Sequence, residues 1–177
     1  MKLELNLSKN DFLQYQLYKS SKMRTIKIQR IRNSIIVSGL VFLLGIYFFI
    51  QIREIICIIF TGIISLIIYL VYSLYFRIFY KRHFSIFIDE NYKNQIGKYF
   101  SLEIIDNYIQ QKDSESEFKI DIKEIKEIVE IQTNYFVSIS EISSIILPKN
   151  TDTKNFINIL IDNHKIKLNE ELNWKWK

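Results

Sequence analysis

The chain has 177 residues, 49% of them hydrophobic and 15% aromatic, and a formal net charge of +5 at pH 7. Its single cysteine, Cys57, excludes an intrachain disulfide, and the scarcity of glycine and proline excludes a low-complexity linker. Before residue 34, eight basic side chains accompany only two acidic ones, whereas acids outnumber bases from residue 84 onward. The basic excess therefore favours a membrane surface, and not a nucleic acid, as its partner.

The N-terminal segment begins with Lys2–Leu7, whose alternation of apolar and polar residues is typical of a half-buried strand. A short helix is expected over Asp11–Tyr18, with Ser8 or Asn10 as its cap. Lys19–Asn33 is basic with interleaved apolar residues, which predicts a helix at the membrane face that runs into the following apolar stretch.

Ser34–Tyr80 is the dominant feature of the sequence. It holds two uncharged apolar runs, Ser34–Ile50 and Ile55–Phe76, separated by the polar break Gln51–Glu54. As helices these runs are roughly 25 and 33 Å long, close to the thickness of the hydrocarbon core of a bilayer. Neither run has a polar stripe, and 177 residues are too few to bury both in a soluble core. The sequence therefore predicts a transmembrane hairpin.

Small residues and aromatic residues occur in this hairpin where a membrane protein needs them. Tyrosine and phenylalanine gather at the ends of the runs, where they suit the membrane–water boundary. The small residues are expected to let the two helices approach closely. They are Gly39, Gly45, Thr61, Gly62 and Ser65.

Basic residues cluster before the first run and after the second, whereas the loop between them holds a single Arg53 beside Glu54. This asymmetry predicts both termini in the cytoplasm and Gln51–Glu54 outside. The abundance of Ile, Lys and Asn suggests an AT-rich bacterial genome, so the expected location is the bacterial inner membrane. The basic side chains are candidates for contact with lipid headgroups, or they serve only to fix the topology. They are Lys22, Arg24, Lys27, Arg30, Arg32, Arg77, Lys81 and Arg82.

After residue 98, apolar and polar residues alternate in short segments, which predicts a β domain followed by one helix. The expected strands are Tyr99–Ile105, Tyr108–Lys112, Phe118–Ile122, Ile128–Gln132, Tyr135–Ile139 and Ile142–Leu147. Turns are expected at Asp106–Asn107, in the acidic loop Asp113–Glu117, at Lys123–Glu127, Thr133–Asn134 and Ser140–Glu141. A helix is expected after Thr151 or Asp152 as its cap, with a buried face made of Phe156, Ile157, Leu160 and Ile161.

The predicted fold is an α+β membrane protein: a transmembrane hairpin plus a cytoplasmic antiparallel β-sheet or barrel closed by a C-terminal helix. Its segments are 1–33 (strand, short helix and basic stretch), 34–80 (hairpin), 81–98 (helical extension), 99–163 (β domain with helix) and 164–177 (tail). Residues 1–18 are expected to pack with the β domain, and the tail either is loose or lies on the membrane with its tryptophans at the interface.

Lys149 is a further candidate site residue. Pro148 lacks a backbone N–H and is expected to end the last strand, which leaves Lys149 exposed before the helix. There it contacts an acidic partner or an anionic headgroup, or it is simply a solvated lysine.

No catalytic or cofactor motif occurs: the sequence lacks GxGxxG, GxxxxGK[ST], HExxH, CxxC and GxSxG. Glu115 and Glu117 alternate and are expected to be solvated, and His83 and His164 are isolated. The sequence therefore predicts no enzyme, no metal and no cofactor.

Several stretches along the chain carry a family resemblance: Asp11–Tyr15, "IGKYFSLEIIDNYIQQ", "FKIDIKEIKEIVEIQTNYFVSI" and above all "IILPKN" from Ile145 to Asn150. Over nearly its whole length the chain resembles the YcxB-like proteins, a bacterial family with two spans and a C-terminal pleckstrin-homology-like (PH-like) domain. Asp121 stands where the family often has tryptophan, and Asn107 where it usually has glycine. These motifs are structural, so the resemblance implies a fold and no shared activity.

Two functions from different classes fit these observations. The first is a membrane-anchored module whose PH-like domain binds a protein or lipid partner, with self-association also open. The alternative is an immunity protein against a toxin that acts in or through the membrane. A toxin gene beside this one would discriminate between them.

Overall fold

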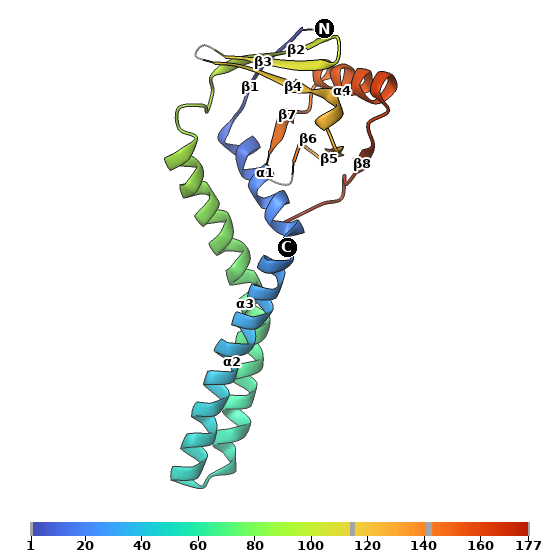
Figure 1. Cartoon of the computed structure of the whole chain (residues 1–177). Coiled ribbons are helices and arrows are strands. Elements are labelled where there is room, and N and C mark those ends of the chain that lie inside the picture. The colour runs from blue at the N-terminus through green and yellow to red at the C-terminus, as the bar shows by residue number, and fades with distance from the viewer. Residues whose placement is uncertain (1, 114–115, 141–142, 177) are drawn as a thin grey trace. The chain divides into compact units, whose positions relative to one another are not determined.

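The computed structural model describes residues 2–113, 116–140 and 143–176 (Figure 1). The described residues form two compact units. The β unit combines Met1–Gln16 with Phe84–Lys175, and the hairpin unit combines Leu17–His83 with Trp176–Lys177. The expectation that residues 1–18 pack with the β domain therefore holds as far as Gln16, whereas Leu17 and Tyr18 belong to the hairpin unit.

Three helices account for the first half of the chain: α1 (Lys9–Lys22), α2 (Arg24–Ile52) and α3 (Ile55–Asn91). The cap of α1 is Ser8, whose hydroxyl accepts the Asp11 N–H at 3.3 Å while its own N–H donates to the Asp11 carboxylate at 2.8 Å. The single helix expected over Lys19–Asn33 is wrong. Met23 adopts an extended backbone (φ −70°, ψ 120°) and separates α1 from α2.

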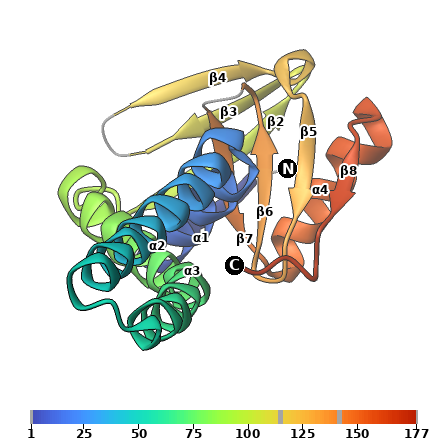
Figure 2. The ribbon, with the colours of Figure 1, turned by 90° about the horizontal axis from the view of Figure 1, so that it is seen from below.

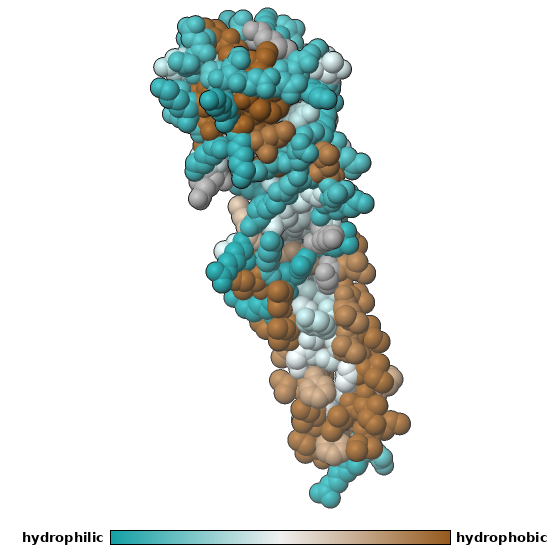
Figure 3. All heavy atoms as spheres, turned by 90° about the vertical axis from the view of Figure 1, so that its right-hand side faces the viewer, coloured by the Kyte–Doolittle hydropathy of each residue, from teal (hydrophilic) through white to brown (hydrophobic). Residues whose placement is uncertain are grey.

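The two long helices α2 and α3 form an antiparallel hairpin. Arg53 makes the turn in a left-handed conformation (φ 58°), and its N–H donates to the Phe49 carbonyl. Both helices are long and apolar enough to cross a membrane, and within their most apolar windows 6% and 0% of the residues are buried. Figure 3 shows the hairpin covered mainly by brown and pale spheres, with hydrophilic atoms at its tip.

The contact between α2 and α3 is a seam of small residues. The buried residues of α2 are Ser34, Ser38 and Gly45. The Ser65 hydroxyl donates to the Ser38 carbonyl at 2.7 Å, and the Ser34 hydroxyl donates to the Tyr69 carbonyl at 3.3 Å. These bonds satisfy hydroxyl groups that would otherwise face an apolar environment.

The predicted small-residue interface is confirmed only in part. A Cβ atom placed on Gly45 would lie 1.9 Å from the Thr61 hydroxyl, so this glycine is required for the close approach. A Cβ atom on Gly62 would meet only Phe42, at 3.8 Å. Gly39 has no atom within 4 Å of its Cβ position and takes no part in the seam.

Helix α3 ends at Asn91, so the helical extension predicted over residues 81–98 is correct for its first part only. Turns follow, and Gly97 (φ 75°) donates its N–H to the Leu7 carbonyl at 2.9 Å. This bond lies beside the pairing of the first strand with the strand that starts at Tyr99.

The β unit contains two four-stranded sheets, which Figure 2 shows as separate layers. The first has the order β1-β2-β3-β4 and is antiparallel throughout. Its strands are β1 (Lys2–Asn6), β2 (Tyr99–Ile105), β3 (Tyr108–Lys112) and β4 (Glu117–Asp121). The predicted turn Asp106–Asn107 is confirmed, with Asp106 at a φ of 51°.

The second sheet has the order β7-β6-β5-β8. Its strands are β5 (Glu127–Glu130), β6 (Asn134–Ser138), β7 (Ser144–Pro148) and β8 (Leu168–Glu170). Strand β8 pairs in parallel with β5, so the expectation of a loose or membrane-bound tail is wrong for residues 168–170. Pro148 is the last residue of β7, as predicted.

The core lies between these strands and α4 (Thr151–His164). The cap of α4 is Asn150, one residue before the predicted Thr151, and it forms a reciprocal capping box with Thr153. Of the predicted buried face, Phe156, Ile157 and Leu160 are buried, whereas Ile161 is only partly buried. Strand β4 is followed by a 3-10 turn (Ile122–Glu124), and Ile122 in this turn and Ile125 directly after it are both buried.

The strands in the described part of the chain form two open sheets, so the alternative of a closed barrel is wrong. Order β1-β2-β3-β4 leaves β4 at an edge, and order β7-β6-β5-β8 leaves β7 at an edge. Some predicted positions lie outside the described residues: Ser114 and Glu115 of the acidic loop, Glu141 of a turn, and Ile142 at the start of a strand.

Candidate functional site

The eight predicted headgroup residues all fall in the hairpin unit, at the polar end of its two helices. This basic end consists of Lys22, Arg24, Lys27, Arg30, Arg32, Arg77, Lys81 and Arg82. Six of these residues are exposed, whereas Arg30 and Arg77 are half-buried. The unit's only acidic residue is Glu54, which lies beside Arg53 in the turn between the helices. The basic end therefore has no acidic side chain within its own sequence to neutralise it.

An aromatic ring lies against Arg30, one of the two half-buried arginines. The Arg30 guanidinium lies 5.9 Å from the centre of the Phe76 ring, which is buried and packs on Tyr80. A cation above an aromatic face is stabilised by about 0.5–1 kcal/mol at an exposed site. Charged and aromatic side chains thus share one level of the hairpin, as at a membrane–water boundary.

Trp176 is joined to the same level of α3 by two reciprocal hydrogen bonds. The Arg77 side chain donates to the Trp176 carbonyl at 2.8 Å, and the Trp176 indole N–H donates to the Arg77 carbonyl at 3.1 Å. The Trp176 ring also lies 6.3 Å from that of Tyr80. Sequence reasoning missed this contact, because the only signal was a tryptophan within a polar tail.

Lys149 is not the exposed loop residue that the sequence predicts. Its ammonium lies 2.5 Å from a Glu130 carboxylate oxygen, and the two side chains are only 24% and 17% exposed. It also lies 5.2 Å from the centre of the Tyr135 ring. The Lys149 N–H donates to the Thr133 carbonyl, and this continuation of the strand pairing brings it to both partners.

Burial and the adjacent Glu130 carboxylate raise the pKa of Tyr135, which therefore remains a neutral phenol. An open cavity of about 880 Å³ lies beside these residues and extends to Lys154 and Glu170. Because Lys149 is already paired with Glu130, its charge is offset within the β unit. The arrangement explains local stability better than it explains recognition of an anion.

Lys149→Glu is expected to lower the free energy of unfolding by about 1–3 kcal/mol, because it replaces a half-buried ion pair by two carboxylates. Denaturant titration of the full chain in detergent micelles measures this. The matched control is Lys154→Glu, an exposed change beside the same cavity, which is expected to stay within about 0.5 kcal/mol. Equal stability of the two variants would show that the Glu130 pair contributes nothing.

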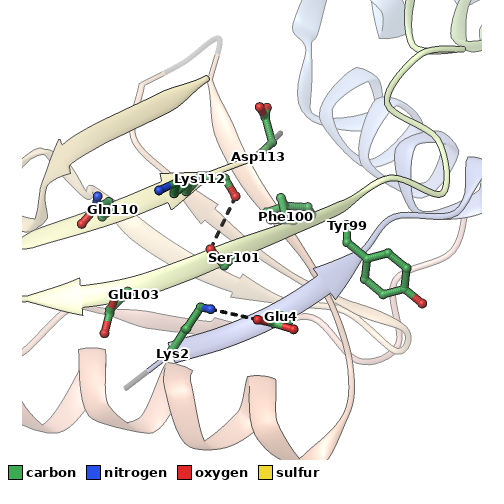
Figure 4. Close-up of a pocket in the computed structure, with 9 residues that line it drawn as sticks. All are labelled: Lys2, Glu4, Tyr99, Phe100, Ser101, Glu103, Gln110, Lys112 and Asp113. Carbon is green, nitrogen blue, oxygen red and sulfur yellow. Dashed lines mark hydrogen bonds and ion pairs between the residues drawn. The ribbon is translucent and has the colours of Figure 1, made fainter. Parts of the chain in front are cut away.

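A second cavity, of about 560 Å³, lies on the outer face of the first sheet (Figure 4). Lys2 and Glu4 form an exposed ion pair there at 2.9 Å, and the Ser101 hydroxyl donates to the Lys112 carbonyl. Its lining combines acidic, basic and amide side chains from β1, β2 and β3. Neighbouring opposite charges of this kind are typical of a solvated sheet face.

A third cavity, of about 700 Å³, is a groove whose walls are mostly apolar or uncharged polar, with Lys98 and Asp113 as the charged exceptions. It is lined by the exposed edges of the two sheets, by the start of α1 and by the turns after α3. Phe118 on β4 remains 57% exposed at this groove, although it is a large aromatic residue. This is the most distinctive recessed surface of the β unit.

No group of three or more potential metal ligands occurs among the described His, Cys, Asp and Glu residues. No family model, curated protein or solved structure matches the chain. The geometry of the chain itself therefore carries the functional argument.

Proposed function

We propose that the chain is a non-catalytic, YcxB-like protein of the bacterial inner membrane. Helices α2 and α3 cross the membrane, both termini and the β unit lie in the cytoplasm, and the β unit binds a partner at the membrane. The turn at Arg53 and Glu54 lies on the outer side.

The observation that carries this proposal is the outward-facing apolar surface of the hairpin. Ile55, Phe60 and Ile78 are 68%, 65% and 70% exposed, and they are typical of both helices. A soluble chain rarely leaves such a continuous apolar surface in water, whereas lipid covers it without cost. The excess of positive charge at one end of the hairpin, against a single Arg53–Glu54 pair in the turn, supports the orientation.

Site-specific labelling of cysteines tests the topology. Because Cys57 is the only cysteine, Cys57→Ser gives a cysteine-free background in one step. In intact cells, a membrane-impermeant maleimide is expected to label Glu54→Cys, in the turn, and to leave Lys119→Cys unlabelled. Lys119 is an exposed residue of β4, so it should react once the cells are permeabilised.

Labelling of Lys119→Cys before permeabilisation would overturn the proposed orientation. Recovery of the protein in the soluble fraction, without detergent, would overturn the membrane location itself. The Cys57→Ser chain without an introduced cysteine serves as the control for nonspecific reaction.

A further inference from the structure

Strand β7 lies at the edge of its sheet, and its hydrogen-bond register determines which backbone groups are free. Its pairing with β6 continues at both ends, where the Lys149 N–H donates to Thr133 and the Ile139 N–H donates to Ser143. Hydrogen-bonded pairs alternate along an antiparallel ladder. Odd-numbered residues of β7 therefore bond to β6, and even-numbered residues turn their N–H and C=O groups to the open edge.

In two of these even-numbered residues, both the backbone N–H and the backbone C=O are free of hydrogen-bond partners among the described residues. Pro148 has no N–H, and its carbonyl accepts the Thr153 hydroxyl at 2.8 Å. The backbone groups of Ser144 and Ile146 have no hydrogen-bond partner among the described residues. Unpaired edge groups of this kind are a template for another strand.

The groove of about 700 Å³ lies directly against these free groups, since Ser144 and Ile146 both line it. The opposite wall includes Phe118 of the edge strand β4. Apart from Lys98 and Asp113, whose charges are opposite, its lining residues are uncharged. The groove therefore lacks the net charge that would attract a nucleic acid or an anionic headgroup.

We propose that an extended, uncharged segment of a partner protein binds in this groove as an additional strand on the free edge of β7. This inference rests on the proposed function and names the class of partner that the β unit takes. Main-chain hydrogen bonds to Ser144 and Ile146 supply affinity, and pockets for alternate side chains supply specificity.

The two faces of β7 define which side chains the segment should carry. Ile145 belongs to the core cluster between the sheets, so partner residues on that face point toward Phe118. Ile146 lies opposite Phe136, whose ring is 5.4 Å from that of Tyr15 on α1. Partner residues on this second face meet Tyr15, so apolar or aromatic side chains fit on both faces.

Selection from a displayed library of random ten-residue peptides, against the full chain in detergent micelles, tests the inference. We expect enrichment of uncharged peptides rich in β-branched and aromatic residues. Ile146→Pro removes a free edge N–H and is expected to weaken binding of a selected peptide at least tenfold. Proline is tolerated on an edge strand when the missing N–H faces outward.

The matched control is Lys119→Pro. On β4 the even-numbered residues bond to β3, so the N–H of Lys119 also faces an open edge. Binding unchanged by Lys119→Pro but lost with Ile146→Pro supports addition to β7. The reverse result places the peptide on β4 and overturns the inference, as does a library that yields no binder.

Hydrogen exchange of the unaltered chain keeps the test decisive if Ile146→Pro fails to fold. The amides of Ser144 and Ile146 are expected to exchange at least tenfold more slowly in the presence of a selected peptide. Unchanged exchange at both amides overturns the inference. The cysteine-labelling pattern is independent of these results, so failure of the groove and failure of the membrane topology are distinguishable.

Discussion

Gly45→Leu is expected to separate α2 from α3. Even the first side-chain carbon at this position would lie 1.9 Å from the Thr61 hydroxyl and 2.5 Å from its Cβ atom. The obstacle is a β-branched side chain on a helix, which has little freedom to move away. Overpacking typically costs about 1–3 kcal/mol, and here we expect the upper end, because the helices must part and lose the Ser38–Ser65 hydrogen bond.

Helix content during titration with a denaturing detergent, in mixed micelles, measures this loss. Gly39→Leu is a matched control on the same helix, since no atom lies within 4 Å of its Cβ position. The double variant with Gly45→Ala and Thr61→Gly should keep the helices in contact, because removal of the whole Thr61 side chain makes room for a methyl group at position 45. Equal midpoints for Gly39→Leu and Gly45→Leu would contradict the observed seam.

The contrast between Gly39 and Gly45 shows the limit of sequence reasoning for this hairpin. The two long helices follow directly from uncharged runs of sufficient length, so both were predictable. Which glycine faces the partner helix depends on the rotation of each helix about its axis. That rotation depends on how the two helices pack against each other, and composition alone does not reveal it.

Most strands of the β unit were predictable, whereas their assembly was not. Tyr99–Ile105 and Tyr108–Lys112 agree with the observed strands residue for residue, because alternation and an Asp-Asn turn are local signals. The division into two sheets depends on pairings between distant segments. Strand β8 is short and polar, and it exists because the Lys167 carbonyl and the Asn169 side chain bond to β5 and Glu127.

The same reason explains the outcome for Lys149. A lysine after a proline, next to asparagine and threonine, predicts an exposed loop. Its two partners, Glu130 and Tyr135, come from the preceding strands β5 and β6, and only the sheet register brings them together. The free edge of β7 is another consequence of register, so the proposed groove also had no signature in the sequence.

Deletion of residues 1–10 is expected to unfold the β unit. Strand β1 pairs with β2 along its whole length, from Lys2 opposite Glu103 to Asn6 opposite Tyr99. Leu3 and Leu5 project from it into the main core cluster and are only 3% and 5% exposed. The deletion also removes the Ser8 cap of α1 and exposes the edge of β2.

A pair of point substitutions measures the packing contribution of the β1 side chains separately from the removal of the backbone of residues 1–10. Each buried leucine replaced by alanine costs about 2–5 kcal/mol, so Leu3→Ala with Leu5→Ala approaches the 5–15 kcal/mol that stabilises a typical domain. The control is Lys2→Ala with Glu4→Ala, on the exposed face of the same strand, where we expect a change within about 0.5 kcal/mol. Near-ultraviolet circular dichroism and denaturant titration distinguish these outcomes. A shortened chain that kept its tertiary signal and its unfolding midpoint would show that β1 lies on the β unit without stabilising it.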